Sequence, residues 1–372
     1  MVSIVHFVPR FSPKQSEIVD DLRRRIIAGE LAPGAQLPGL VEMSRKYKTS
    51  EVTAQRAMAH LRKAGFVRTR RREGSYVSLN LPNLCNFGIV FDHPAGVDHY
   101  EFNYLTVWLR EAKRLMDPGL PRDERRRISL FHEVPGAEPG RKHRELIEKV
   151  ENQQLAGVVF PEAMIALRGT PVMEAPDLAR VVVSPVPVPG CKVVALAPFT
   201  EDVLDFLATR GRKRVAFITI TFHPSKPYTQ QLIGQAACRG LTTHPHWVQA
   251  ACVTSPGWAL NCVRLLLHGE GDDRPDALVI TDDNLVPDAT KGILEAGVRV
   301  PDELEVIAHC NFPWPTANAV PVWRVGYDIR KLLHTCLGLI ERQRRGGHVP
   351  DVTEMAHVFD AELKNPFEGV PE

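Results

Sequence analysis

The spacing of apolar residues near the N-terminus predicts an amphipathic helix. Ile18, Leu22 and Ile26 recur every four residues, which places them on one face of a helix. The segment Ser12–Gln15 before them has a Ser cap, a Pro at the first helical position and a Gln three residues after the cap. Together these residues form a capping box, and Gly29 supplies the expected end of the helix.

Two further helices are predicted in the next part of the chain. Leu40–Tyr47 suits a short helix, and Ser50 is placed to cap another that runs to about Ala64, where Gly65 stops it. Apolar residues of this last helix follow the i, i+3, i+4, i+7 pattern of a buried face. They are Ala54, Ala57, Met58 and Leu61. The opposite face carries Val52, Arg56, Ala59 and Lys63.

A basic β-hairpin is predicted directly after this helix. Phe66–Arg70 and Ser75–Val77 are short β-prone segments on either side of a turn that contains Gly74. The tip of the hairpin holds Arg70, Arg71 and Arg72. Three helices followed by a charged hairpin are the order of a winged helix, and the common use of such a module is to place a helix in a DNA groove.

From Asn86 onward, short apolar runs alternate with segments of helical pattern. The runs are Phe87–Phe91, Ile128–Phe131, Ala156–Phe160, Arg214–Thr219, Ala277–Thr281 and Glu305–Ala308. Helices are expected at Tyr100–Met116 and Arg141–Gln153. Continuous apolar runs are typical of buried parallel strands. The sequence therefore predicts an α/β fold in which two lobes of doubly wound parallel sheet follow the winged helix, with ligands expected at the carboxyl ends of strands.

Charge is divided unevenly between these two parts of the chain. The whole chain has 46 Lys and Arg against 44 Asp and Glu, yet residues 1–78 hold 15 against 7 and the remainder 31 against 37. A basic head on a mildly acidic body is the electrostatic signature of a nucleic-acid module attached to another domain. We therefore expect a DNA-binding domain at 1–79, a linker at 80–86 and a two-lobed effector-binding and dimerisation domain at 87–372.

Composition also narrows the cellular setting. Seven Cys residues occur without a CxxC pair, which favours reduced thiols in the cytoplasm. No apolar run approaches the roughly 20 residues that span a bilayer. Ser12-Pro13-Lys14 interrupts any signal-peptide core at an early position. We expect a cytoplasmic protein with no membrane partner.

The helix capped by Ser50 offers side chains that can read DNA. Thr53 and Gln55 flank its exposed face near the N-terminus, where polar groups approach base edges and Gln can pair with adenine. Arg56 is expected to meet phosphates, which position the helix without reading sequence. Arg70 and Arg72 of the hairpin would follow the backbone or enter the minor groove. For any one of these hairpin Arg residues, a solvated charge at a hairpin tip is the alternative.

The N-terminal part resembles the GntR family of bacterial transcription regulators. The matching residues include Gly29-Glu30-Leu31-x-Pro33-Gly34-x-x-Leu37-Pro38, Ser50-x-x-Thr53-x-x-x-Ala57 and Gly74-Ser75-Tyr76-Val77. This resemblance implies a winged helix-turn-helix domain whose DNA-binding set includes Ser50, Gly74 and Ser75. Val41 and Glu51 stand where the family usually has Arg, so the operator sequence does not carry over.

The rest of the chain resembles the regulatory domain of the LacI/GalR family, which is related to periplasmic sugar-binding proteins. The matching segments are 211–218, Arg274-Pro275-Asp276-Ala277-Leu278 with Asp282-Asp283-Asn284, and 297–307. A GntR-type head on a LacI-type body is the arrangement of arabinose-repressor-like regulators. The resemblance implies a homodimer that binds an operator in double-stranded DNA and a small-molecule effector, a sugar or a sugar derivative.

Ligand residues of the LacI family transfer only in part. Asp283 matches the family's acidic residue, but Gln231 occupies the place of its Arg, and Cys310 followed by Asn311 occupies the place of a second Asp. Losing an Arg and an Asp removes two charge-assisted bonds that hold polyols. The residues that we expect to contact a ligand are Asp92, Tyr100, Gln231, Asp283, Asn311 and Trp314.

Other chemistry finds little support in the sequence. The most suggestive His cluster, Thr243–Trp247, lacks the spacing that a helix or hairpin turns into a tetrahedral metal site. No GxSxG, P-loop or GxGxxG motif is present. We expect neither an enzyme nor a cofactor. The sequence thus predicts a ligand-responsive transcription regulator, a repressor, and leaves open a DNA-binding protein whose body only dimerises and binds no small ligand.

Overall fold

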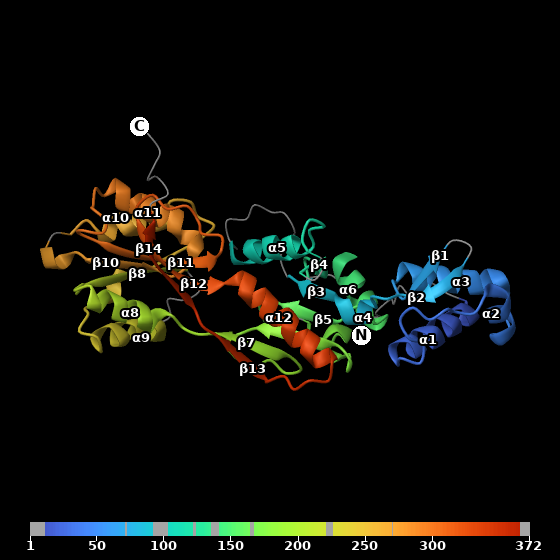
Figure 1. The fold of residues 1–372 in the computed structure, drawn as a ribbon. Helices are drawn as coiled ribbons and strands as arrows, with labels where there is room; N and C mark the ends of the chain where they lie inside the picture. Colours follow the sequence, from blue (N-terminus) through green and yellow to red (C-terminus); the bar gives the residue numbers. More distant parts are fainter. Residues whose placement is uncertain are drawn as a thin grey trace, which may run out of the picture.

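The computed structural model describes residues 12–70, 73–91, 103–121, 124–134, 141–163, 167–220, 226–269 and 271–364. The head, the N-terminal lobe and the C-terminal lobe follow one another along the molecule (Figure 1). Each of the three parts has its own buried apolar cluster. The predicted architecture, a winged helix followed by two α/β lobes, is confirmed.

The head contains three helices and a two-stranded antiparallel wing. Its elements are α1 (Pro13–Ile27), α2 (Leu40–Lys46), α3 (Glu51–Lys63), β1 (Val67–Arg70) and β2 (Gly74–Val77). The Ser12 side chain accepts a hydrogen bond from the Gln15 N–H, as the capping pattern predicts. Ala54, Ala57, Met58 and Leu61 of α3 pack into the core of the head, so the predicted buried face is confirmed.

A helical turn, α4 (Pro82–Cys85), connects the head to the N-terminal lobe. It lies within the segment 80–86 that the sequence suggests as a linker, and Asn86 at the end of that segment is the first residue of strand β3. The Asn86 amide donates to the Gln154 carbonyl oxygen at 2.9 Å, which ties the end of the connection to the lobe. The connection between head and lobe is therefore short and ordered.

The N-terminal lobe is built on a six-stranded parallel sheet of strand order β13-β7-β6-β5-β3-β4. Its strands are β3 (Asn86–Val90), β4 (Arg127–Phe131), β5 (Gly157–Phe160), β6 (Ala179–Val183), β7 (Lys192–Leu196) and β13 (Val352–Met355). Its helices are α5 (Asn103–Leu115), α6 (Arg141–Glu151), α7 (Pro171–Glu174) and α12 (Ile329–Arg344). The runs predicted as strands at 87–91, 128–131 and 156–160 are confirmed, whereas β6 and β7 are not among the runs that the sequence analysis selected.

The C-terminal lobe has a sheet of order β14-β12-β11-β10-β8-β9, in which only β14 is antiparallel to its neighbour. Its strands are β8 (Val215–Ile220), β9 (Val248–Ala251), β10 (Ala277–Ile280), β11 (Glu305–Phe312), β12 (Val322–Asp328) and β14 (Val358–Lys364). Its helices are α8 (Thr200–Thr209), α9 (Lys226–Ala237), α10 (Trp258–Leu266) and α11 (Val286–Glu295), with 3-10 turns at Pro245–Trp247, Gly271–Asp273 and Asp283–Leu285.

The chain crosses between the lobes more than once. After β12 it returns to the N-terminal lobe, where α12 packs into the apolar cluster of α5, β5 and β6 and β13 joins the edge of the sheet. It then crosses back, and β14 pairs with β12. Figure 1 shows α12 and β13 beside the strands of the N-terminal lobe. Residues far apart in the sequence thus form one lobe, and the junction between the lobes is made of several chain segments.

One expected boundary is wrong. The apolar run predicts a strand that ends at Ala308, with Cys310 and Asn311 after it, but β11 continues to Phe312. The strand is longer because β11 pairs with β12 from Ile307 to Phe312, which supplies backbone partners beyond the apolar run. Cys310 is therefore a buried strand residue, whereas Asn311 alternates with it on the other face of the sheet.

Candidate nucleic-acid interface and interlobe site

Helix α3 presents a mixed polar and apolar face to solvent. Gln55 and Arg56, both predicted to meet DNA, are exposed on it. Thr53 is half-buried, and its hydroxyl lies 2.9 Å from the hydroxyl of Ser50. The Ser50 oxygen also accepts from the Thr53 backbone N–H at 3.2 Å, which makes Ser50 the N-cap of the helix. Gln55 and Arg56 therefore have exposed side chains at this face, while Ser50 and Thr53 cap the N-terminal end of the helix.

Val52 is a surface residue that the predicted DNA-binding set lacks. It is 56% exposed in the first turn of α3. An exposed apolar residue at the start of a recognition helix can contact the methyl group of thymine. The signal was present in the sequence, because Val52 falls on the face opposite the buried stripe and is the one large apolar residue there.

Arg70, at the end of β1 in the wing, is held by two contacts. The Arg70 guanidinium lies 3.3 Å from the Glu73 carboxylate and 5.0 Å from the centre of the Tyr76 ring. Gly74 has a φ of +110°, which only Gly adopts readily, and it lets the hairpin turn into β2. Ser75 is a half-buried residue of β2, and its carbonyl oxygen accepts from the Leu37 N–H. Arg72 lies outside the described residues.

A polar cluster joins the two lobes around Asp283. This residue follows β10 and is 1% exposed. Its Oδ2 accepts a hydrogen bond from the side-chain amide of Asn103, at the start of α5 in the other lobe. The same oxygen accepts a second hydrogen bond from the side-chain amide of Asn311 at 2.8 Å. The Asn103 backbone N–H also donates to the Asn284 side-chain oxygen at 3.0 Å. Two of the predicted ligand residues, Asp283 and Asn311, therefore lie together at the junction of the lobes.

The buried position of Asp283 affects the protonation of its carboxyl group. Burial raises the pKa of the Asp283 carboxyl above its usual range, although the nearby His309 and the two amide donors act in the opposite direction. The His309 ring lies 4.0 Å from Asp283 and stacks on Phe199 with ring centres 5.6 Å apart. His309 Nδ1 and Asn311 Oδ1 are among the buried side-chain atoms of the described residues that have no hydrogen-bond partner. A polar molecule bound beside Asp283 would satisfy both of them.

The other predicted ligand residues do not join this cluster. Gln231 is exposed on α9, and Asp92 and Tyr100 lie outside the described residues. Trp314 is 41% exposed, but its indole N–H donates to Glu111 of α5 at 2.8 Å, and Arg110 covers its ring at 5.2 Å. Trp314 thus takes part in a second contact between the lobes.

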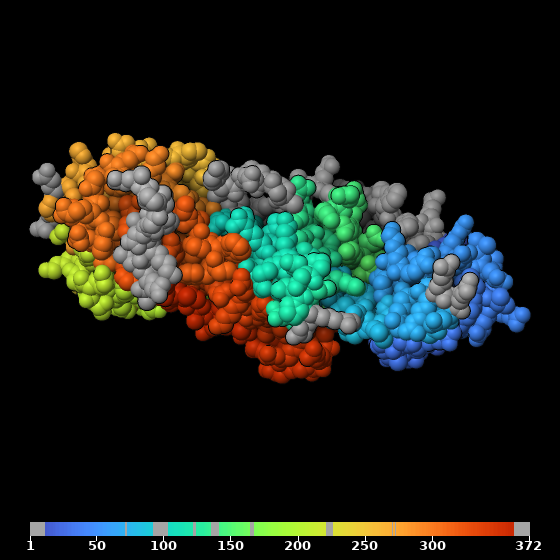
Figure 2. Space-filling view, turned by 45° about the horizontal axis from the view of Figure 1, so that its top comes forward, coloured from blue at the N-terminus to red at the C-terminus, as the bar shows by residue number. Residues whose placement is uncertain are grey.

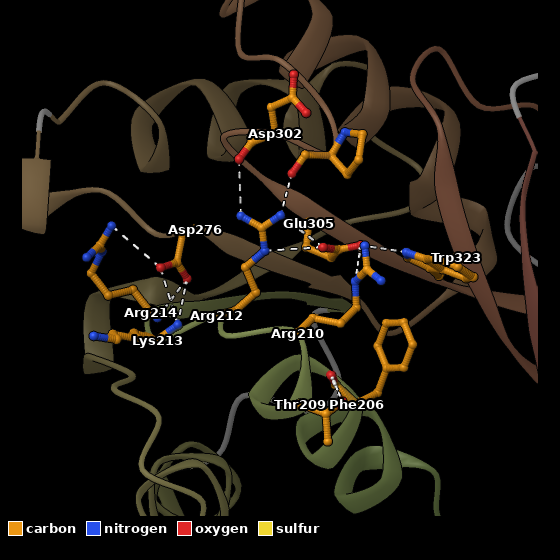
Figure 3. Close-up of polar contacts among 11 residues, drawn as sticks. Phe206, Thr209, Arg210, Arg212, Lys213, Arg214, Asp276, Asp302, Glu305 and Trp323 are labelled. Atoms are coloured by element: carbon orange, nitrogen blue, oxygen red, sulfur yellow. Dashed lines mark hydrogen bonds and ion pairs between the residues drawn. The ribbon is translucent and has the colours of Figure 1, made fainter.

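A further polar network lies around Glu305, at the amino end of β11 (Figure 3). Its buried carboxylate accepts from Arg212 at 2.9 Å, pairs with Arg210 at 3.0 Å and accepts from the Trp323 indole at 2.6 Å. The Asp276 carboxylate accepts from the backbone N–H groups of residues 213 and 214. Glu305 and Asp276 lie at the opposite ends of the strands from Asp283. We therefore infer that their contacts stabilise the C-terminal lobe and do not bind a ligand.

Neither a metal site nor a membrane-spanning helix is found in the described part of the chain. No His, Cys, Asp and Glu side chains gather there in a group of three or more that would hold a metal ion. Within the same residues, no helix has both the length and the apolar character that crossing a membrane requires.

Two family models match separate parts of the sequence. Residues 14–77 match the bacterial regulatory proteins of the gntR family, and residues 204–355 match the periplasmic binding protein-like domain. These ranges correspond to the winged head and to most of the C-terminal lobe together with α12 and β13. The family models therefore agree with the division of the structure into a head and a two-lobed body.

Individual proteins are similar to different lengths of the chain. The uncharacterized HTH-type transcriptional regulator YhcF of Bacillus subtilis (strain 168) is 33% identical over 66 residues, which are 18% of this chain and 54% of that protein. The chain thus spans about half the length of YhcF. The arabinose metabolism transcriptional repressor of Geobacillus stearothermophilus is 22% identical over 331 residues, 83% of this chain and 85% of that one.

Solved structures of LacI regulators share the fold of the body. A LacI regulator from Lactobacillus casei with bound TRIS has a TM-score of 0.53 at 17% identity, over 80% of this chain and 99% of that one. A LacI family transcriptional regulator from Arthrobacter sp. FB24 in complex with lactose has a TM-score of 0.54 at 12% identity, over 74% and 97%. The chain therefore joins a segment that matches the gntR family model to a segment that matches the periplasmic binding protein-like domain, and it is similar to the arabinose metabolism transcriptional repressor over most of its length.

Proposed function

We propose that the protein is a homodimeric transcriptional repressor whose affinity for its operator changes when a small neutral polyol binds between the lobes. The observation that carries this proposal is the polar cluster around Asp283. It joins residues of both lobes, and it leaves buried polar atoms of His309 and Asn311 without partners among the described residues. A ligand with several hydroxyl groups can donate to the Asp283 carboxylate and to Asn311 Oδ1 and accept from an imidazole N–H.

The chemistry of the cluster favours a neutral ligand over an anion. Asp283 is buried, and the groups that act on its carboxyl are two amides, one imidazole and the Asp282 carboxylate, so the charge beside a ligand there is negative rather than positive. The LacI family structures with bound glucose or lactose hold neutral sugars. A sugar or a sugar derivative is therefore the class of effector that we propose, with Asp283 and Asn311 as contacts.

The coupling to DNA follows from the position of this site. A ligand that inserts beside Asp283 must share or replace the Asn103–Asp283 hydrogen bond, which is a direct bond between the lobes. A change in lobe closure in each subunit of a dimer alters the spacing of the two heads and hence their fit to half-sites one helical turn apart. Coupling of this kind is typically about 1–3 kcal/mol and acts equally on DNA affinity and on ligand affinity.

One observation favours a second candidate. The Asp283 carboxylate is already bonded to two amides, and Gln231 is exposed on α9, so the body can be stable as a dimerisation module without a ligand. The two candidates differ in their response to sugars.

The test has a binding part and a DNA part. Full-length protein is screened by thermal shift against neutral sugars and sugar acids, and a ligand at about 100 times its Kd stabilises the folded state by about 2.7 kcal/mol. Footprinting on the DNA that flanks the protein's own gene then shows whether the same compound changes operator occupancy. A footprint that no sugar alters, together with an unchanged Tm, would establish the dimerisation module. The absence of any footprint would refute the assignment as a regulator of that DNA.

A further inference from the structure

We propose that the N-terminal lobe carries a second DNA-contacting surface, separate from the winged head, which binds the phosphodiester backbone beside the site that α3 reads. This inference rests on the proposed function, because it requires that the head bind DNA. The surface is formed by Arg125, Arg126, Arg127, Arg344 and Arg345, and we call it the arginine surface. It surrounds a hollow of about 710 Å³ whose wall includes Asn80 and Leu84 of the connection to the head.

The arginine surface has an excess of positive charge. Five of the residues that line the hollow are arginines, and the one acidic residue among them is Glu341. Arg126 lies 3.5 Å from Glu341, Arg125 donates to the carbonyl oxygens of residues 118 and 120, and Arg344 donates to the Asp177 carbonyl oxygen at 2.7 Å. These contacts hold the three guanidinium groups in place, and only one of the three is paired with a described carboxylate across the hollow.

Arg127 and Arg345 differ from the other three arginines. Both are exposed, as Arg125 is, but among the described residues neither guanidinium forms a hydrogen bond or an ion pair. Arg127 begins β4, and Arg345 directly follows α12. The backbone of each residue is held in place by the strand or helix to which it is attached. The side chains of both residues can still bind an anion from solution.

The arginine surface lies next to the head. A terminal nitrogen of Arg127 is 3.9 Å from the position that a Cβ on Gly65 would occupy, and Gly65 lies just beyond the end of α3. The Arg23 guanidinium of α1 donates to the Asn152 side chain of the N-terminal lobe at 2.6 Å, which holds the head against the lobe on another side. In the space-filling view the N-terminal lobe lies directly beside the head (Figure 2).

The distances involved fit a DNA duplex. Helix α3 has 13 residues and is therefore about 20 Å long, so the arginine surface begins about 20 Å from the N-terminal turn that would read bases. One turn of B-DNA is about 34 Å long, and phosphates occur along its whole length. A duplex whose axis runs from the N-terminal turn of α3 towards Gly65 brings its phosphates within reach of Arg127, and Arg345 lines the same hollow.

A backbone phosphate fits this surface better than a small anion does. Arginine is suited to phosphate because its planar group donates two parallel hydrogen bonds. Here the guanidiniums of Arg127 and Arg345 are exposed and, within the described part of the chain, unbonded, whereas those of Arg125, Arg126 and Arg344 are already bonded to protein oxygens. A small phosphorylated ligand inside the hollow would find few guanidinium N–H groups that are not already bonded. A duplex that lies across the opening of the hollow would meet both Arg127 and Arg345.

The test removes the two exposed charges in the full-length protein. The double variant Arg127→Gln/Arg345→Gln is compared with Arg264→Gln/Lys291→Gln, which removes two exposed charges from α10 and α11 of the other lobe. Binding to a random-sequence duplex that extends well beyond one head is measured over a range of salt concentrations. Each lost phosphate contact lowers the slope of log K against log salt by about 0.9, so we expect the slope to fall by about 1.8 for the first variant and to stay unchanged for the control.

Two further measurements separate the possible outcomes. When the duplex is shortened to the length that one head covers, the difference between the first variant and wild type should disappear. Equal slopes for the two double variants on the long duplex would overturn the second surface while leaving DNA binding by the head intact. If inorganic phosphate raises the Tm of wild type but not of the first variant, and the slopes are equal, the surface is a small-anion site instead. A wild-type protein without salt-dependent DNA binding would refute the proposed function itself.

Discussion

The indole N–H of Trp314 donates to the carboxylate of Glu111, 203 residues earlier in the chain, at 2.8 Å. Glu111 lies in α5 of the N-terminal lobe, and Trp314 follows β11 of the C-terminal lobe, so this hydrogen bond crosses the junction. Arg330, at the start of α12, donates to the same carboxylate at 2.8 Å. Glu111 is therefore the point at which helices and loops from both lobes are held together.

We expect Glu111→Gln to lower the free energy of unfolding by about 2 kcal/mol. The carboxylate is buried, and its charge-assisted hydrogen bonds are each worth about 1.5–3 kcal/mol, but Arg114 and Arg330 keep part of their solvation. Urea unfolding of wild type, of this variant and of the exposed control Glu295→Gln measures the difference. A loss equal to that of the control would show that the Glu111 contacts contribute nothing to stability.

The same residue should make stability depend on acid. Burial alone would raise the pKa of Glu111, but the hydrogen bonds from Arg330, Arg114 and Trp314 outweigh it and lower the pKa to about 2. Because the folded pKa lies below the unfolded value, the contribution is complete above about 4.5 and is lost as pH falls towards 2. The stability difference between wild type and Glu111→Gln should therefore shrink over that interval, and a constant difference would contradict the assignment.

Asp283 should show the opposite dependence. Burial raises its pKa, so the folded state retains the proton to higher pH than the unfolded state, and its contribution to stability declines as pH rises from 3.8 through the raised pKa. In Asp283→Asn the side-chain oxygen can still accept from Asn103 and Asn311, but it does not titrate. We expect the variant to gain stability relative to wild type as pH rises, which unfolding curves at several pH values measure.

The ligand response gives Asp283→Asn a second readout. If the carboxylate accepts hydrogen bonds from hydroxyl groups of the effector, the variant should lose the thermal shift that the effector causes in wild type. The exposed control Asp302→Asn should keep it. A variant that retains the full shift would place the effector away from Asp283.

Gln55→Ala should weaken specific DNA binding and leave non-specific binding unchanged. Gln55 is exposed on α3, and a bidentate contact to a base is worth about 1–3 kcal/mol, which corresponds to roughly 5- to 150-fold in affinity. Gln230→Ala, an exposed substitution on α9, is the matched control. Affinities for the operator and for a random duplex are compared at one salt concentration. An equal loss on both duplexes would mean that Gln55 does not read a base.

Val52→Ala tests the residue that the structure adds to this surface. Removing two methyl groups from a contact with a thymine methyl should lower specific affinity by about 1 kcal/mol, because each buried methyl-sized group contributes about 0.8 kcal/mol at most when fully desolvated. Val186→Ala, at a valine of the N-terminal lobe that is 59% exposed, is the comparison. Operator affinity is the measurement, and no change for Val52→Ala would place this side chain outside the groove.

Local sequence patterns are sufficient to predict the helices of the head and many of the strands of the body. The buried face of α3 and the Ser50 cap depend on residues within one or two helical turns, so their periodicity and spacing predict them. The strands at 87–91 and 277–281 are recognisable because a strand buried on both faces must be apolar along its length.

Only the tertiary structure decided which distant residues meet. The Asn103–Asp283 and Glu111–Trp314 bonds join positions separated by 180 and 203 residues, and no local pattern encodes such a pairing. The same is true of β13, which joins the edge of a sheet begun at residue 86, and of Arg127 and Arg345, which come together from β4 and the end of α12. Local periodicity reports which side of an element is buried, whereas the partner across the interface depends on how the lobes pack and where the chain crosses between them.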